Sequence, residues 1–114
     1  MPAVPSGGVE QWRELVCSAP FVWDCGWALR VIGCESGGNP NAVGTEWYEG
    51  QLWYFVGLWQ IATLNEAMTP VLKDPVRNTA EADYKYRHGG VGHWPVCGSD
   101  RISSLGTEGS DGSS

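Results

Sequence analysis

The stretch from Trp27 to Pro40 constrains the fold most, because its pattern predicts both a buried helix and the point where that helix ends. It reads W-A-L-R-V-I-G-C-E-S-G-G-N-P. Its apolar residues recur at helical spacing and Glu35 continues the same line, so this carboxylate is directed toward the interior. The G-G-N-P sequence supplies the positive φ that ends a helix and a proline that prevents its continuation. We therefore expect a helix whose last turn holds Glu35.

A carboxylate in that position is electrostatically unfavourable. The negative end of the helix dipole and partial desolvation both raise its pKa. A carboxylic acid that stays protonated near neutral pH is what acid-catalysed cleavage of a glycosidic bond requires. The alternative is that Glu35 interrupts the apolar stripe and reaches solvent beyond the helix end. This stretch alone favours neither interpretation.

The length and charge of the chain limit its partners. A chain of 114 residues, 42% of them hydrophobic, supports one compact domain with one core, which we place at residues 9–98 between an irregular lead-in (1–8) and a flexible Gly/Ser-rich tail (99–114). The net charge of −6 and the absence of a Lys/Arg cluster argue against nucleic acid as a partner. No stretch approaches the roughly 20 apolar residues of a membrane span. We expect a monomer that contacts neither nucleic acid nor membrane.

The four cysteines lack the C-x2-C spacing of a zinc site, so we expect two disulfides and no metal or other cofactor. Cys34–Cys97 would tie the central helix to the end of the domain, and Cys17–Cys25 would close a short loop, although the sequence leaves the connectivity open. The longer loop could be worth roughly 3–5 kcal/mol in the chain-entropy model. Disulfides indicate an oxidising, extracytoplasmic location, whereas residues 1–25 show no signal peptide.

The remaining elements follow from local patterns. Residues 9–17 read as a short amphipathic helix, and 41–56 as either a hairpin or a long irregular excursion. A short helix is expected over 66–72, and Asp74 with Pro75 marks the start of another that extends to residue 88. The residues that this last helix should bury are Val76, Thr79, Ala80, Ala82, Tyr84 and Tyr86.

Two groups of residues point to a binding cleft. Gln60 is polar within an apolar run, so it either satisfies backbone groups or faces a polar cleft. The segment from Trp47 to Phe55 holds more aromatic surface than a short loop needs, and aromatic faces stack on sugar rings. The alternative is that about half of these rings fill the core.

The order of three motifs resembles a known family. A-L-R-V-I-G-C-E-S-G-G-N-P-N-A-V, then Y-F-V-G-L-W-Q-I-A, then L-K-D-P-V-R-N-T-A-E-A-D-Y are similar to the lytic transglycosylase domain of the soluble-transglycosylase type, glycoside hydrolase family 23 of the lysozyme-like superfamily. The end, G-G-V-G-H-W-P-V-C-G, resembles the close of resuscitation-promoting-factor domains. The resemblance covers roughly residues 27–98.

The resemblance implies a mainly α, small α+β protein with a lysozyme-like fold and a substrate cleft between a helical lobe and the aromatic hairpin or loop. Glu35 then matches the single catalytic acid, Gln60 a glutamine that lines the sugar cleft, and Tyr54 an aromatic position before it. Ser36 follows the acid as in the family and is expected to bind the substrate; the alternative is a purely local role at the helix end. Aromatic chemistry adds three further expected sugar contacts, Trp47, Tyr48 and Trp59. The tyrosine of the family's A-Y-N-A-G-like segment has no counterpart here.

The activity that the resemblance implies is cleavage of the MurNAc-β-1,4-GlcNAc bond of peptidoglycan glycan strands, with 1,6-anhydro products. It implies a secreted protein, or one located at the cell wall or in a phage virion. One alternative is a lysozyme-type hydrolase, a phage lysin or a resuscitation-promoting-factor-like enzyme, in which Glu46 or Glu49 directs a water. Another is a non-catalytic module that binds glycan. A metal or redox protein is disfavoured by the cysteine spacing.

Overall fold

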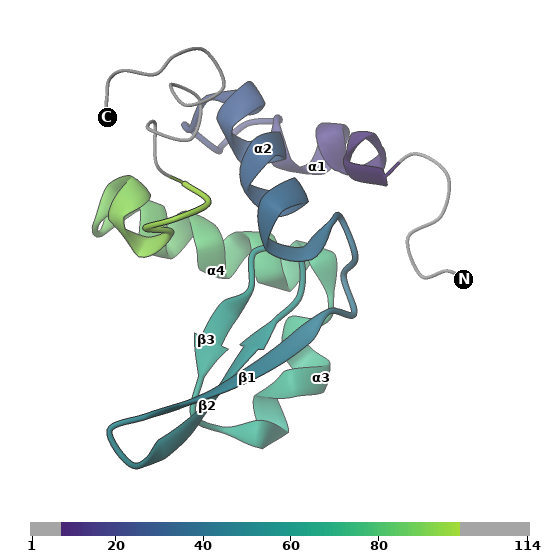
Figure 1. Cartoon of the computed structure of the whole chain (residues 1–114). Helices are drawn as coiled ribbons and strands as arrows, with labels where there is room; N and C mark the ends of the chain where they lie inside the picture. The colour runs from purple at the N-terminus through teal and green to yellow at the C-terminus, as the bar shows by residue number, and fades with distance from the viewer. Residues whose placement is uncertain (1–7, 99–114) are drawn as a thin grey trace.

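The structure is a computed structural model that describes residues 8–98. It is a small α+β fold in which four α-helices and short 3-10 turns pack along one side and beyond one end of a three-stranded antiparallel sheet (Figure 1). The predicted small α+β class is thereby confirmed. The lead-in before residue 8 and the tail from residue 99 lie outside the described residues.

The N-terminal helices lie where the sequence predicts them, except that the first half of the expected 9–17 helix is a 3-10 turn. A 3-10 turn, η1 (Gly8–Trp12), leads into α1 (Arg13–Val16), and α2 follows at Cys25–Ser36. Asp24 caps α2 by accepting a hydrogen bond from the backbone N–H of Trp27 (2.8 Å). Gly37 ends it with φ of +67°, a left-handed conformation that favours glycine. Glu35 therefore lies in the last turn of α2.

The segment after α2 forms the hairpin, one of the two conformations that the sequence left open. Strands β1 (Val43–Tyr48) and β2 (Gln51–Val56) pair antiparallel. The two-residue turn between them, Glu49-Gly50, has positive φ at both positions (52° and 80°), as the tight turns that match strand twist require. A third strand, β3 (Ile61–Thr63), pairs with β2 and was not predicted.

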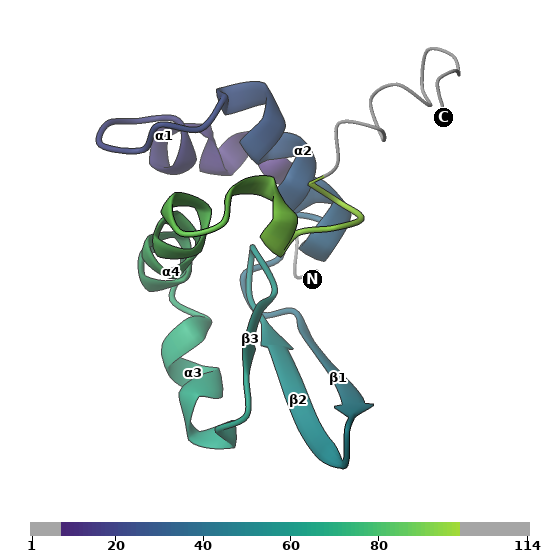
Figure 2. The same cartoon turned by 90° about the vertical axis from the view of Figure 1, so that its left-hand side faces the viewer.

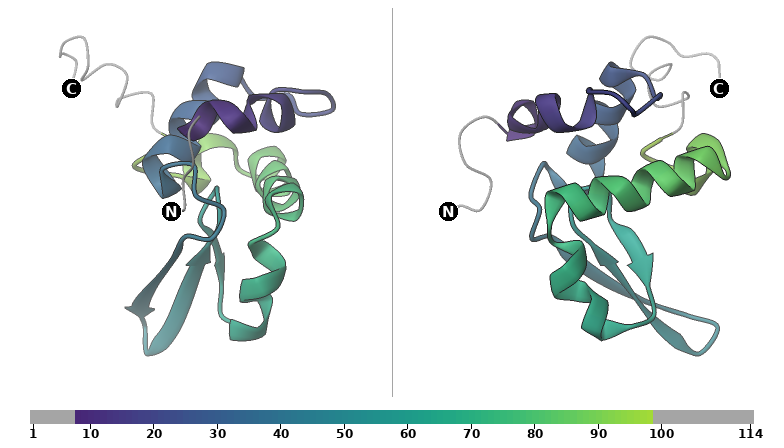
Figure 3. Two further views of the ribbon diagram at one scale, coloured as in Figure 1. Left: turned by 90° about the vertical axis from the view of Figure 1, so that its right-hand side faces the viewer. Right: turned by 180° about the vertical axis from the view of Figure 1, so that it is seen from behind.

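The C-terminal half is again helical. After η2 (Glu66–Met68) and α3 (Thr69–Leu72), helix α4 spans Pro75–Arg87 and η3 spans Gly90–His93. Asp74 caps α4 through the N–H of Val76, as predicted. Helix α3 packs against β2, and α4 contacts β3 (Figures 2 and 3).

The predicted buried face of α4 is partly wrong. Thr79 and Ala82 are buried as expected, whereas Val76 and Tyr84 are exposed (63% and 61%), as is Ala80. The inward position goes to Asn78, whose side chain is fully buried. Because this amide satisfies backbone groups of neighbouring segments, a polar residue takes a place that hydrophobic patterning assigned to apolar ones.

The core is built around aromatic rings. The indoles of Trp23, Trp27, Trp59 and Trp94 pack on one another with ring centroids 4.6–6.2 Å apart. Each indole N–H finds an acceptor, for example that of Trp94 on the carbonyl of Trp59 (3.1 Å). Large rings with satisfied polar atoms let a short chain bury much apolar area.

Both expected disulfides are present. Cys17–Cys25 closes the loop between α1 and α2, and Cys34–Cys97 joins the end of α2 to the segment after η3. Two disulfides suggest an oxidising, extracytoplasmic environment. Among the described residues, no helix is both long and apolar enough to cross a membrane.

Candidate functional site

Glu35 is half-buried at the C-terminal end of α2. Its carboxylate has no hydrogen bond or ion pair with any residue in the range 8–98, and burial raises its pKa above the usual range for a glutamate. The sequence left open whether this side chain faces the interior or the solvent. The structure places it partly inside, in a condition that favours the protonated acid.

Glu35 lines a groove of about 240 Å³, which we call the Glu35 groove. Its walls come from the end of α2, from β2 and β3, and from α4 and the segment around η3. Figure 2 shows these elements around the junction of the helices with the sheet. The residues that line the groove are Glu35, Phe55, Gln60, Ile61, Ala62, Lys85, His93, Trp94 and Pro95. The groove therefore brings together two residues predicted for the site, Glu35 and Gln60.

Gln60 is held rigidly at the edge of this groove. Its Nε2 donates to the carbonyl oxygens of Ala42 and Gly57, each at 3.1 Å. Its backbone φ of +50° is unusual for a residue with a side chain. A Cβ on Gly44 would lie 3.5 Å from Oε1 of Gln60. Since both Nε2 bonds go to backbone, Oε1 is the atom that Gln60 offers to a ligand.

Buried Asn78 fixes the turn that carries Gln60. Its Oδ1 accepts from the backbone N–H of Trp59 (2.8 Å), and its Nδ2 donates to the carbonyls of Val56 and Leu72 (2.7 and 2.8 Å). A Cβ on Gly57 would lie 2.4 Å from Nδ2, so only glycine fits there. Helix α4 thus holds the Gly57–Gln60 turn in position through the side chain of Asn78.

Trp59 lies in the core and does not line the Glu35 groove, so its predicted sugar contact is wrong. Its side chain is 0% exposed, and its indole N–H donates to Thr79 Oγ1 (3.2 Å) within the aromatic core. Trp59 alternates with Gln60 across the turn, so one points into the core while the other faces the groove. Its contribution is structural.

Two further predicted sugar contacts, Tyr54 and Trp47, line neither the Glu35 groove nor the pocket next to it. Because side chains alternate along a strand, Tyr54 points to the sheet face opposite Trp53 and Phe55. Tyr54 packs against the core, whereas Trp47 is 70% exposed on that opposite face.

Ser36 also takes a local role. Its hydroxyl donates to the carbonyl of Ile32 (3.0 Å) and accepts from the N–H of Gly38 (3.2 Å). These bonds close the end of α2, which is one of the two roles that the sequence allowed. Ser36 is absent from the lining of the groove.

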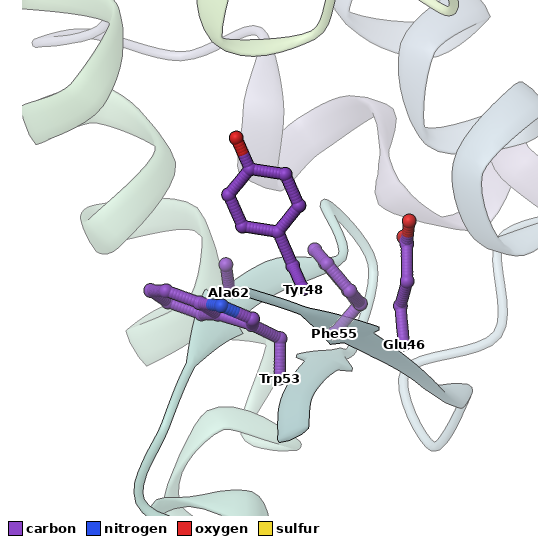
Figure 4. Close-up of a pocket in the computed structure, with 5 residues that line it drawn as sticks. All are labelled: Glu46, Tyr48, Trp53, Phe55 and Ala62. Carbon is purple, nitrogen blue, oxygen red and sulfur yellow. The ribbon is translucent and has the colours of Figure 1, made fainter. Parts of the chain in front are cut away.

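The predicted residue Tyr48 lies in a second pocket, of about 340 Å³, next to the groove. We call it the aromatic pocket; Figure 4 shows the five residues that line it, Glu46, Tyr48, Trp53, Phe55 and Ala62. Phe55 and Ala62 line both hollows. The groove and the pocket are therefore neighbours on one sheet face.

Sequence reasoning missed several lining residues. Trp53 and Phe55 belong to the aromatic segment that the sequence singled out, and the alternation along β2 could have selected them as lining residues once a hairpin was assumed. Lys85 and His93 carry no local signal, because only the packing of α4 and η3 against the sheet brings them to the groove. Within residues 8–98, no group of three or more His, Cys, Asp or Glu side chains is arranged to hold a metal ion.

Comparisons of the chain with models of protein families, with curated proteins and with solved structures found no match. The class that the described geometry defines is a small disulfide-linked α+β domain with an acidic residue in a groove between helices and sheet.

Proposed function

We propose that the chain is a peptidoglycan-cleaving muramidase with a lysozyme-like fold, most similar in motif order to the soluble lytic transglycosylases. One observation carries the proposal. Glu35 is half-buried with a raised pKa, and it is the only carboxylate among the described residues that line the groove it shares with Gln60. A single acid in a groove suits a reaction that needs one proton donor.

The fold supports the proposal through the order of its parts. A helix ends at the acid, an antiparallel sheet follows, and the Gly57–Gln60 turn returns the chain to the same groove. This is the order that the resemblance implies for a cleft between a helical lobe and an aromatic hairpin. The glycan strand would lie across the groove, with Oε1 of Gln60 accepting a hydrogen bond from the sugar.

The proposed chemistry uses Glu35 twice. Its protonated carboxyl donates to the glycosidic oxygen between MurNAc and GlcNAc, while the N-acetyl oxygen of the sugar attacks the anomeric carbon, as in substrate-assisted glycosidases. The carboxylate so formed accepts the proton of the muramic 6-hydroxyl. That oxygen attacks the anomeric carbon, the bond from this carbon to the N-acetyl oxygen breaks, and the 1,6-anhydro ring closes. The acid is regenerated, and no water is consumed.

The position of the other carboxylates favours this route over hydrolysis. A hydrolase of the two-carboxylate type needs a second acidic group to direct a water. Glu46 lies in the aromatic pocket and Glu49 in the β1–β2 turn, and neither lines the Glu35 groove. We therefore expect anhydro products rather than reducing ends.

The test is a digest of insoluble peptidoglycan by wild type, Glu35→Gln and, as a control for loss of an exposed carboxylate, Glu14→Gln. Positioned acid catalysis contributes about 10²–10⁴-fold, so Glu35→Gln should lose most activity while it keeps the fold. Mass spectrometry of the soluble muropeptides identifies the ends. Equal rates for wild type and Glu35→Gln would contradict the role of Glu35, and reducing ends would identify a hydrolase.

A module that binds glycan without cleaving it is a second candidate, favoured by the Glu35 groove itself, where Oε1 of Gln60 is free to accept a hydrogen bond from a sugar. Its signature would be binding to insoluble peptidoglycan by both wild type and Glu35→Gln with no soluble fragments from either.

A further inference from the structure

The aromatic pocket is built from side chains that alternate along three strands. Glu46 and Tyr48 come from β1, Trp53 and Phe55 from β2, and Ala62 from β3. Cross-strand pairing sets Glu46 opposite Trp53 and Phe55 opposite Ala62. All of them project from the same side of the sheet in Figure 4. The pocket therefore follows from the strand register of the hairpin and is not a gap between loops.

The rings of this pocket have no aromatic partners. In the core, the indoles pack closely on one another, whereas among residues 8–98 no stacked or edge-on pair involves Tyr48, Trp53 or Phe55. Figure 4 shows Tyr48 nearly face-on and Trp53 edge-on, so their planes cross. Tyr48 is 59% exposed. Crossed rings with free faces form walls around a compact group rather than a flat platform for a sugar ring.

The charge of the pocket favours a cation. Glu46 is its one charged residue, and this carboxylate has no ion pair or hydrogen bond with any described residue. The faces of aromatic rings are also negative, and they attract ammonium groups. With a net charge of −6, the whole chain adds to this preference. An anionic ligand would find no positive group among the lining residues.

The polarity of the lining indicates which kind of molecule should carry the positive charge. Apart from Glu46, the polar atoms of the pocket are the Tyr48 hydroxyl and the Trp53 indole N–H; Phe55 and Ala62 are apolar. A sugar ring would leave several hydroxyl groups against apolar walls. An alkyl chain that ends in an ammonium group matches both the apolar walls and the negative groups of the pocket. A primary ammonium can also donate hydrogen bonds to the Glu46 carboxylate.

We propose that the aromatic pocket binds a primary alkylammonium group, such as the side chain of a lysine-like residue in a peptide. The ammonium lies between Tyr48 and Trp53 and donates to the Glu46 carboxylate, while its alkyl chain contacts Phe55 and Ala62. The site itself is independent of the proposed muramidase activity. One extension rests on that activity: a peptide attached to the glycan strand in the Glu35 groove would present its free amino group to the neighbouring pocket.

The test is a titration followed by NMR of the Trp53 indole N–H, assigned with Trp53→Phe. The probe is Nα-acetyl-lysine methylamide, and the comparison probe is the same compound acetylated on Nε, which keeps the chain and removes the charge. We expect the lysine probe to bind roughly three- to tenfold more tightly than the acetylated one, the range that a cation beside exposed rings and one carboxylate gives. Glu46→Gln should weaken the lysine probe by a similar factor, and Glu49→Gln, a matched change in the adjacent turn, should leave it unchanged.

Three results would overturn the proposal. Equal binding of the two probes, or equal binding by wild type and Glu46→Gln, would remove the role of the charge. Tetramethylammonium that binds as tightly as the lysine probe would identify a quaternary ammonium site instead. Chitotriose that shifts the Trp53 resonance when the lysine probe does not would identify a sugar site. None of these readouts depends on catalysis, so a failed peptidoglycan digest would not decide them.

Discussion

At the scale of single residues, two properties of Glu35 determine its chemistry: its burial and its lack of an ion pair within residues 8–98. It is half-buried, and it has no partner of opposite charge among the described residues. Burial favours its neutral form, so its pKa rises above the usual value of about 4.3. A group in this condition is suited to donate a proton, and it also makes the folded state sensitive to pH.

We expect Glu35→Gln to change how stability depends on pH. The pKa of Glu35 is higher in the folded state than in the unfolded state. Below the unfolded pKa the group is protonated in both states, so its ionisation does not change the free energy of unfolding. As the pH rises above about 4.3 and through the raised pKa, ionising the buried carboxyl destabilises wild type. The free energy of unfolding of Glu35→Gln should therefore increase relative to wild type over this window.

Urea denaturation of both proteins at several pH values measures this difference, with Glu14→Gln as the exposed control. A difference between Glu35→Gln and wild type that stays constant with pH would show that burial does not perturb Glu35.

At the scale of elements, the short Gly57–Gln60 turn depends on helix α4. Asn78 makes three hydrogen bonds to backbone groups of Val56, Trp59 and Leu72. The turn has little regular structure of its own, since it lies between β2 and β3. The position of Gln60 in the groove therefore follows from a buried amide on a different element.

Replacing Asn78 with Leu should destabilise the fold strongly although it inserts an apolar residue into the core. Leu removes the Asn78 bonds to one backbone N–H and two carbonyls, and each buried group left without a partner costs about 1–3 kcal/mol. Urea denaturation should show a loss of at least that size. Asn78→Gln is not a suitable control because the Gln side chain is longer. The control is Arg77→Gln, on the exposed side of α4. A loss no larger than that of the control would contradict this role of Asn78.

At the scale of the whole molecule, the Cys34–Cys97 disulfide connects the end of α2 to the last described residues. The two cysteines are 63 positions apart, and Cys34 adjoins Glu35. The C-terminal segment supplies Trp94 to the aromatic core and Pro95 to the groove. The same bond therefore stabilises the fold and helps to keep one wall of the groove in place.

Removing this bond with Cys34→Ser and Cys97→Ser should lower the free energy of unfolding by about 3–5 kcal/mol in the chain-entropy model. Removing Cys17–Cys25, whose cysteines are only 8 positions apart, should cost less because the closed loop is shorter. Denaturation of both double variants measures the two effects. Equal losses, or a larger loss for the short loop, would contradict the entropic explanation.

The sequence by itself determined the features that depend on neighbours along the chain. The end of α2 after Glu35 follows from glycines and a proline, and the start of α4 follows from Asp74 and Pro75. The hairpin was one of two predicted conformations, decided by a turn in which both residues adopt positive φ. These outcomes were predictable because their causes are local backbone preferences.

Only the tertiary structure decided which side chains reach the site. Strand register placed Phe55 rather than Tyr54 beside the groove, and packing buried Trp59 while it brought Lys85 and His93 to the groove wall. A strand face or a position on α4 has no functional meaning until another element covers the opposite side. Whether an aromatic ring binds a ligand or fills the core is therefore set by contacts between distant parts of the chain, which periodicity and motifs do not encode.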